Sequence, residues 1–201
     1  MPRSPDNRPP VVLVHGFFIN SVVFRRLAAD LAARGWSVHT PDFAANYRQV
    51  GLEELAAQLA DYIEKTFAPS QPIDLVGLSM GGLVARYYLQ RLSGIDRVQR
   101  FISISAPHHG TWMAHLIPSL PCVQMRPHSE FLRDLNQDVA MLARVNLTYL
   151  WTPWDFIIVP ASSSILPVGT GVRLPIVTHA CMARHPLSMA AVADALSAPL
   201  F

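Results

Sequence analysis

The stretch VGLSMGGLVARYY, Val76 to Tyr88, places one serine between glycines where an apolar run changes to a helical pattern. The apolar run over 73–78 is typical of a buried strand, and residues 81–92 have helical spacing. Gly77-Leu78-Ser79-Met80-Gly81 thus fits a G-x-S-x-G turn between strand and helix, in which a sharp bend lifts the serine hydroxyl above the sheet. The alternative is an ordinary glycine-rich turn with Ser79 as helix cap.

The remainder of the chain alternates in the same way between strand-like and helix-like segments. Strands are predicted over 11–15, 36–41, 73–78, 98–105, 147–151 and, more weakly, 172–178, and helices over 21–33, 52–67, 81–92, 131–145 and 187–196. This alternation predicts an α/β fold with a mainly parallel central sheet and helices on both faces. Because ligands bind off the carboxyl ends of parallel strands, we expect a site in the loops that follow strands.

Composition restricts the class of protein. The 201 residues indicate one domain, taken as residues 10–201 after a flexible lead of residues 1–9. The chain is 51% hydrophobic and 15% charged, yet no apolar run approaches the ~18 residues of a membrane helix. The net charge of +2 without a dense Lys/Arg tract argues against a nucleic-acid partner. The apolar excess therefore indicates a large core or an exposed patch that binds an apolar ligand.

The first residues and the two cysteines give weaker information. MPRSPDNRPP lacks the apolar stretch of a secretory signal, which predicts a cytoplasmic protein, or a secreted or periplasmic one if the chain is a processed form. Cys122 and Cys181 both follow strands, and a disulfide and two free thiols are equally expected. His108, His109 and His115 lack nearby carboxylates. We therefore expect no metal. We also expect no other cofactor, no stable membrane insertion, and a monomer.

A nucleophilic serine needs a base and an acid that orients the base. After a G-x-S-x-G serine the acid comes next in the chain and the histidine last. Asp155 follows the strand predicted over 147–151, at the expected edge of the sheet. Only His179 and His185 lie late enough for the base; His185 enters the final helix and is preferred, with His179 as the alternative. The predicted catalytic residues are therefore Ser79, Asp155 and His185.

A second loop is expected to supply a hydrogen-bond donor to the reaction. VLVHGFF, Val12 to Phe18, is a strand followed by a tight His-Gly turn, and the N–H of Phe17 can then point toward the nucleophile. The N–H of Met80 is the other expected donor of an oxyanion hole. His15 precedes the serine, out of order for a base, and is interpreted as a structural residue that supports this loop.

These motifs together resemble the α/β-hydrolase superfamily. VVLVHGFF, VGLSMGGLVARYY, SISAPHHGT, QMRPHSEFLRDLN and WDFIIVP, followed by a late histidine, are similar to small bacterial lipases and lipase-like esterases of the triacylglycerol lipase type, over roughly residues 10 to 190. The resemblance implies a serine carboxylic-ester hydrolase acting on lipid-like or other apolar esters. It also implies Ser79, Asp155 and His185 as the triad, Phe17 and Met80 as oxyanion donors, and a structural role for the His108-His109 pair.

The chain departs from larger lipases around the expected crevice. Phe17, Phe18 and Ile19 stand where further glycines are common, and there is no room for a large lid insertion. We expect Phe18, Trp112, Ile117 and Ile157 to contact an apolar ester substrate. The same triad also suits a thioesterase, an acyltransferase or a polyester hydrolase, and a non-catalytic binding protein is a further alternative.

Overall fold

The computed structural model describes residues 8–43 and 50–200, and these form one six-stranded parallel sheet. The strand order is β2-β1-β3-β4-β5-β6, and every neighbouring pair is parallel. This confirms the predicted α/β class. The strands are β1 Val11–Val14, β2 Val38–His39, β3 Ile73–Leu78, β4 Val98–Ile104, β5 Asn146–Trp151 and β6 Thr170–Arg173.

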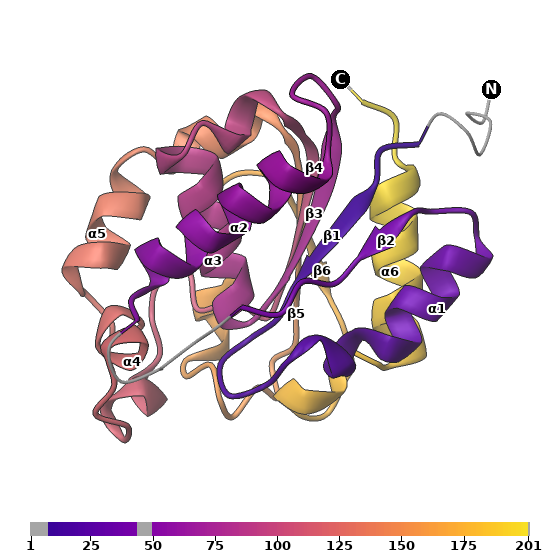
Figure 1. The fold of residues 1–201 in the computed structure, drawn as a ribbon. Helices are drawn as coiled ribbons and strands as arrows, with labels where there is room; N and C mark the ends of the chain where they lie inside the picture. Colours follow the sequence, from indigo (N-terminus) through magenta and orange to yellow (C-terminus); the bar gives the residue numbers. More distant parts are fainter. Residues whose placement is uncertain (1–7, 44–49, 201) are drawn as a thin grey trace.

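Helices cover both faces of the sheet (Figure 1). Helices α1 and α6 lie on one face, and α2, α3 and α5 lie on the other. The α-helices are α1 Arg25–Ala33, α2 Leu52–Thr66, α3 Met80–Arg91, α4 Leu120–Gln124, α5 Glu130–Gln137 and α6 Pro186–Ser197. Short 3-10 helices are η2 Ser21–Phe24, η3 Gly94–Asp96, η4 Trp112–His115, η5 Val139–Arg144, η6 Ala161–Ser164 and η7 His179–Cys181.

The central strands separate two apolar cores. Alternate side chains of β1 point to opposite faces, so Leu13 packs with α1 and α6, whereas Val14 packs with α2 and α3. Every residue of β1 and β3 is buried. Strands buried on both faces need near-continuous apolar sequence, which is why the runs over 11–14 and 73–78 were recognisable.

Two elements are shorter in the structure than the sequence predicts. The weak strand predicted over 172–178 ends at Arg173, because Pro175 has no N–H to continue the ladder. The helix predicted over 131–145 divides into α5 and η5 at Asp138. The Asp138 carboxylate accepts hydrogen bonds from Gln90 and Arg91 of α3, which fixes the chain at this break.

Arg8 and Pro9, the last two residues of the expected flexible lead, lie within the described residues. The Arg8 guanidinium lies 4.4 Å above the centre of the Trp36 ring and donates a 2.8 Å hydrogen bond to Arg34 O. Pro9 is buried. These two residues are therefore packed on the domain, while residues 1–7 of the predicted lead lie outside the described residues.

The longest connection, between β4 and β5, is packed against the domain and forms no large lid. Gln124 of α4 accepts a 2.8 Å hydrogen bond from Leu52 N and thereby caps the start of α2. Thr111 N donates to Met125 O at 2.8 Å, which ties the start of this connection to the residue after α4. In the described ranges, no helix has both the length and the apolar character needed to cross a membrane.

Gly81 provides a test of how closely α3 approaches β1. A Cβ at this position would lie 2.6 Å from His15 O and closer still to Val14 O, both of them backbone atoms that cannot move aside. Gly81→Ala is therefore expected to lower the free energy of unfolding by about 2 kcal/mol or more, although alanine normally stabilises a helix. Urea unfolding followed by circular dichroism measures the change.

Gly51→Ala is the matched control. Its Cβ would meet only the ends of the Glu53 and Gln124 side chains, which can rotate away. We expect this variant to lose less than about 1 kcal/mol, mostly from the poorer helix cap. A Gly81→Ala protein as stable as the control would show that the approach of α3 to β1 is not sterically restricted.

Candidate active site

Ser79 lies at the tip of a strained turn between β3 and α3. Its backbone has φ 54° and ψ −123°, a positive-φ conformation that costs energy for any residue with a Cβ. The turn is held by hydrogen bonds from Ser79 N to Ile104 O at 2.8 Å and from Gly82 N to Ser79 O at 2.9 Å. The side chain is partly exposed, as a nucleophile requires, and Met80 begins the helix directly after it.

Close backbone packing explains the glycines around this serine. A Cβ at Gly77 would lie 2.6 Å from Gly82 Cα, and a Cβ at Gly82 would lie 2.5 Å from Ala106 Cβ. The strand and the helix on either side of the turn can therefore meet only because Gly77 lacks a side chain, and Gly82 leaves room for Ala106 after β4. The G-x-S-x-G pattern thus has the structural context predicted from the sequence: a buried strand, a sharp turn and a helix.

The acid and its imidazole partner come from the loops after β5 and β6. Asp155 Oδ2 lies 2.7 Å from His179 Nδ1. Asp155 Oδ1 accepts hydrogen bonds from Ile157 N at 3.0 Å and Ile158 N at 2.9 Å. The Asp155 side chain is 2% exposed and that of His179 is 15% exposed. A carboxylate held in this way fixes the orientation of the ring and leaves Nε2 of His179 as its other nitrogen.

This arrangement corrects the pairing predicted from chain order, in which Asp155 would orient His185. His185 is instead the N-cap of α6, and its Nδ1 accepts a 3.2 Å hydrogen bond from Leu187 N. The residue after it, Pro186, occupies the first position of the helix and favours an extended conformation at His185. The imidazole is therefore turned back onto its own helix, and the alternative, His179, stands beside the acid.

Two buried threonines hold the loop that carries Asp155. Thr111 Oγ1 donates to Ile157 O at 2.6 Å and accepts from Val159 N at 3.0 Å. Thr152 Oγ1 donates to Ile176 O at 2.6 Å, three residues before His179. The acid loop is thus fixed to the segment after β4 on one side and to the segment carrying the imidazole on the other. Sequence reasoning missed both threonines, although Thr111 stands within the PHHGT motif.

Thr178, directly before His179, also has a strained backbone. Its φ of 93° is an outlier for a β-branched residue. Such strain persists only where the surroundings fix the conformation, and it is concentrated at functional sites.

In this structure the Ser79 hydroxyl makes no hydrogen bond to His179 or to any other described residue. Hydrogen bonds between a nucleophile and its base are often formed only with substrate bound.

The loop after β1 passes directly beside the serine. A Cβ on Gly16 would lie 3.2 Å from Ser79 Cβ, so this turn approaches Ser79 closely. His15 is 3% exposed; its Nδ1 is 3.0 Å from Gly16 O, and its Nε2 accepts from Phe43 N at 3.4 Å. His15 therefore supports the loop, as predicted. Phe17 and Met80, the expected oxyanion donors, follow Gly16 and Ser79 in the chain on either side of this contact.

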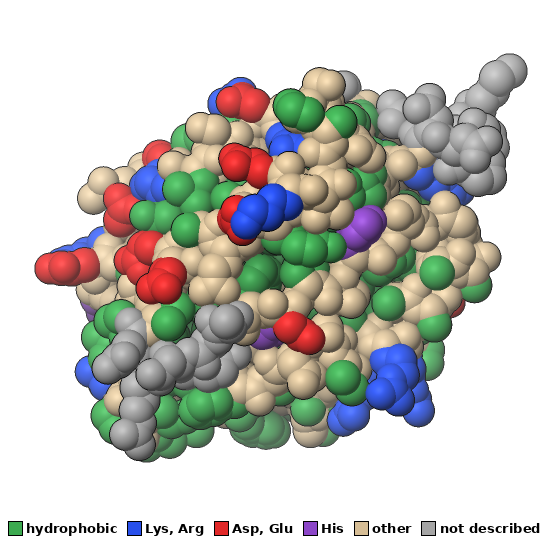
Figure 2. All heavy atoms as spheres, viewed as in Figure 1, with side chains coloured by type: hydrophobic (Ala, Val, Ile, Leu, Met, Phe, Trp, Pro, Cys, Tyr) green, Lys and Arg blue, Asp and Glu red, His purple; other side chains and the backbone are tan. Residues whose placement is uncertain are grey.

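The four predicted substrate contacts are exposed side chains on loops at the carboxyl edge. Phe18 is 64% exposed, Trp112 58%, Ile157 49% and Ile117 37%. They belong to a wider set of exposed large apolar residues that all follow β1, β4, β5 or β6. We call this set the apolar rim: Phe18, Ile19, Val22, Trp112, Met113, Leu116, Ile117, Leu120, Val123, Trp154, Phe156, Ile157, Val177 and Leu187. Figure 2 shows hydrophobic side chains along this lower edge of the molecule.

The PHHGT segment is supported by a fully buried arginine. Arg86 of α3 donates to Leu135 O at 2.8 Å and to Asn136 Oδ1 at 3.1 Å, and its Nη1 lies 3.4 Å from His108 Nδ1. His108 Nε2 lies 2.8 Å from Ser103 Oγ. Burial lowers the pKa of Arg86 to about 9. Burial, and then the charge of Arg86, hold the pKa of His108 well below its ordinary value, so its imidazole stays neutral.

The described residues also show where potential metal ligands and the two cysteines lie. In the part of the chain that is described, no group of three or more His, Cys, Asp or Glu residues is placed to hold a metal ion. Cys122 is buried in α4 and Cys181 is half-buried in η7, and both are free thiols. Of the two equally expected states, the structure therefore has the unbridged one. Burial raises the pKa of the Cys122 thiol.

Residues 9–136 match the alpha/beta hydrolase fold family, and because this is more than half of the chain, the chain belongs to that family. Lipase B of Aspergillus fumigatus has the same fold, with a TM-score of 0.83 and 23% identity over 97% of this chain and 54% of its own. The mature lipase BlEst2 of Bacillus licheniformis superimposes with a TM-score of 0.76 and 17% identity over 95% of this chain and 93% of its own.

Among curated sequences, a pimeloyl-[acyl-carrier protein] methyl ester esterase of Chromobacterium violaceum is 34% identical over 84 residues, covering 41% of this chain and 32% of the esterase. The chain spans between a fifth and a third of the length of the curated relatives that it matches. Because these two solved structures are less than 25% identical to the chain, they are evidence for its fold alone.

His108 predicts a specific dependence of stability on pH. A folded state that holds this imidazole neutral binds fewer protons than the unfolded chain once the pH falls below the ordinary histidine value of 6.5. The free energy of unfolding should therefore fall with decreasing pH, and His108 contributes at most about 1.4 kcal/mol per pH unit. Urea unfolding at several pH values between 7.5 and 5 measures the slope, and His108→Gln should flatten it.

His109→Gln is the matched control, because it removes the exposed imidazole next in the chain and leaves the buried one in place. We expect its slope between pH 7.5 and 5 to equal that of the unmodified protein. Equal slopes for His108→Gln and the unmodified protein would contradict a buried, neutral His108.

Proposed function

We propose that this chain is a serine carboxylic-ester hydrolase of the lipase or esterase type. The observation that carries the proposal is the Asp155–His179 pair, with its 2.7 Å contact, at the sheet edge where the strained turn presents Ser79. Two backbone amides already hold the buried carboxylate through Oδ1, and its Oδ2 orients the imidazole. Paired with a raised serine in the order serine, acid, histidine, it supports nucleophilic catalysis.

In the proposed mechanism, Ser79 Oγ attacks the ester carbonyl while Nε2 of His179 accepts the serine proton. Asp155 holds the ring through Nδ1 and stabilises the positive charge that develops on it. The amides of Phe17 and Met80 donate hydrogen bonds to the tetrahedral oxyanion; this role is supported by the close approach of Gly16 to Ser79 and by the start of α3 directly after the serine.

The tetrahedral intermediate then collapses, and His179 gives its proton to the departing alcohol. Ser79 is left as an acyl ester. Water, deprotonated by His179, attacks this acyl group and releases the carboxylic acid, which returns the serine to its starting state. The residues present provide every proton transfer in this sequence, and no metal or organic cofactor is needed.

The apolar rim supports apolar or lipid-like esters as substrates, because it places exposed aliphatic and aromatic side chains on the loops around the serine. The sequence relatives include a methyl ester esterase, which favours ester hydrolysis as the reaction. The same residues can also attack a thioester or a polyester. Comparing turnover of p-nitrophenyl esters, acyl thioesters and an insoluble polyester separates these reactions.

Ser79→Ala tests the nucleophile. Removing the hydroxyl should lower kcat on a p-nitrophenyl ester by at least ~10³-fold, because the remaining triad members cannot act without it. Labelling with a fluorophosphonate probe should also be lost. Circular dichroism and urea unfolding serve as controls for folding. A folded variant that keeps a tenth of the activity, or a wild-type chain that never reacts with the probe, would favour a non-catalytic binding protein.

His179→Ala and His185→Ala form a matched pair for the base. His179→Ala should lower kcat at least ~10³-fold, whereas His185→Ala should retain kcat within a few-fold and lose about 1 kcal/mol of stability through its helix cap. Asp155→Asn should lower kcat by up to ~10⁴-fold by changing the ring tautomer. If His185→Ala were inactive and His179→Ala active, His185 would be the base, as predicted from the sequence.

A further inference from the structure

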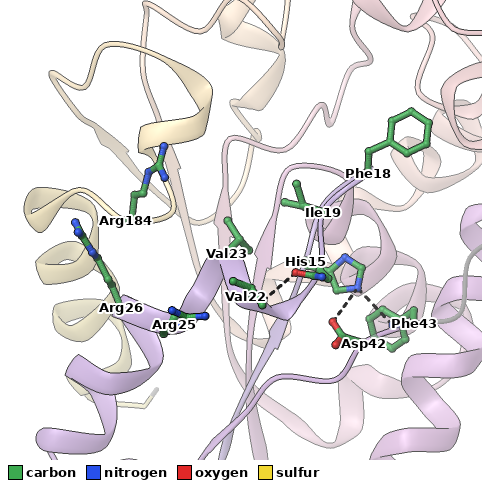
Figure 3. A pocket seen from close by; sticks show the side chains of 11 residues that line it. His15, Phe18, Ile19, Val22, Val23, Arg25, Arg26, Asp42, Phe43 and Arg184 are labelled. Carbon is green, nitrogen blue, oxygen red and sulfur yellow. Dashed lines mark hydrogen bonds and ion pairs between the residues drawn. The ribbon is translucent and has the colours of Figure 1, made fainter.

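A cavity of about 880 Å³ opens beside the candidate active site, between the loop after β1 and the start of α6. Figure 3 shows its walls: Phe18, Ile19, His15 and Phe43 lie on one side, and Arg25, Arg26 and Arg184 lie on the other. Its size is in the range of small-molecule sites in proteins. The cavity therefore combines an apolar wall with a group of three cations.

The apolar wall of this cavity reaches the nucleophile. Ile19 Cδ1 and Ser79 Cβ both lie within 3.4 Å of the position that a Cβ on Gly16 would occupy. The cationic wall is connected to the base, because Arg184 is five residues after His179 and its N–H donates to Cys181 O at 3.0 Å. A substrate bound at Ser79 can thus extend along Ile19 toward the arginines.

The three arginines have no partner within the described protein. Arg25, Arg26 and Arg184 are exposed, and among residues 8–43 and 50–200 none of their side chains makes a hydrogen bond or an ion pair. Several arginines elsewhere are paired with carboxylates: Arg34, Arg91 and Arg144 each contact an aspartate at 2.9 Å or less. Unpaired guanidinium groups beside a cavity are available to bind an anion.

One carboxylate also lines the cavity. Asp42 lies on the wall opposite the arginines (Figure 3). It accepts from Ser21 N at 2.6 Å and from Ser21 Oγ at 3.0 Å, and it is 4.0 Å from His15 Nε2. Asp42 is thus occupied in holding the loop after β1. The cavity keeps an excess of positive charge on the arginine side.

We propose that this cavity is a substrate subsite for an anionic group, so that the preferred esters carry a carboxylate or a phosphate at the far end of an apolar chain. The proposal rests on the ester hydrolase function proposed above and specifies its substrate class. Planar guanidinium groups bind carboxylate and phosphate through paired, charge-assisted hydrogen bonds, and three of them with no internal partner favour such a ligand over a neutral one.

The kinetic test compares esters that differ only in terminal charge. We measure kcat/KM for the p-nitrophenyl ester of hexanoic acid and for the p-nitrophenyl monoester of adipic acid, which has a carboxylate at the end of the same six-carbon chain. A second pair, hexanoyl esters of 4-hydroxybenzoate and of its methyl ester, places the charge on the alcohol side. In at least one pair, the anionic ester should be preferred at least tenfold by the unmodified protein.

The double variant Arg26→Gln, Arg184→Gln should reduce that preference at least tenfold. The double variant Arg34→Gln, Arg144→Gln is the matched control, because it removes two charges from exposed arginines that are paired with Asp30 and Asp96, and it should keep the wild-type preference. Equal loss in both variants would show a general effect of net charge and overturn the subsite. An unmodified protein that treats charged and neutral esters alike, or prefers the neutral ones, would overturn it as well.

A binding test separates this proposal from the proposed function. Calorimetric titration of Ser79→Ala with hexyl phosphate, hexanoate and hexanol needs no turnover. At least one anion should bind ten times more tightly than hexanol, and the Arg26, Arg184 double variant in the same background should lose this difference; the stronger of the two anions identifies phosphate or carboxylate. Tight anion binding without ester hydrolysis would support the subsite and contradict the proposed hydrolase function. Equal binding of all three compounds would overturn the subsite whatever the activity.

Discussion

The close contact between α3 and the ends of β1 and β3 determines the rest of the site. Glycines at 77 and 81 let backbone meet backbone, and Gly82 leaves room for Ala106; a Cβ at any of the three positions would lie within about 2.6 Å of a neighbouring atom. This packing sets the start of α3 beside the Ser79 hydroxyl and brings Gly16 against it. The geometry at Ser79 and the packing of α3 on the sheet therefore depend on the same glycines.

Much of this arrangement was visible in the sequence because its physical causes are local. Buried parallel strands need near-continuous apolar sequence, and the run over 73–78, followed by a glycine-rich turn and a helical pattern, is typical of such a strand. The sharp turn needs glycine, so the position of Ser79 at this turn could be predicted, as could the position of Asp155 after β5. These predictions depend on neighbours along the chain, not on contacts between distant segments.

The features that were missed depend on such distant contacts. Chain order allowed both His179 and His185, and only the fold shows that Pro186 turns His185 into a helix cap while Thr178 directs the next residue toward the acid. Thr111 and Thr152 act through carbonyl groups of other loops, for which sequence has no signal. Arg86 is fully buried, and its partners come from α5 and the PHHGT segment, for which the sequence around Arg86 carries no signal.

The position of β6 gives the two halves of the candidate site different local stabilities. Ser79 follows β3, a fully buried inner strand, whereas His179 follows β6, a four-residue edge strand whose side chains are largely exposed. Edge segments with little buried apolar surface open at a lower free energy than the whole domain. The Ser79 side of the candidate site therefore follows a more deeply buried strand than the His179 side, whose segment is anchored instead by the buried side chains of Leu174, Ile176 and Met182 after β6.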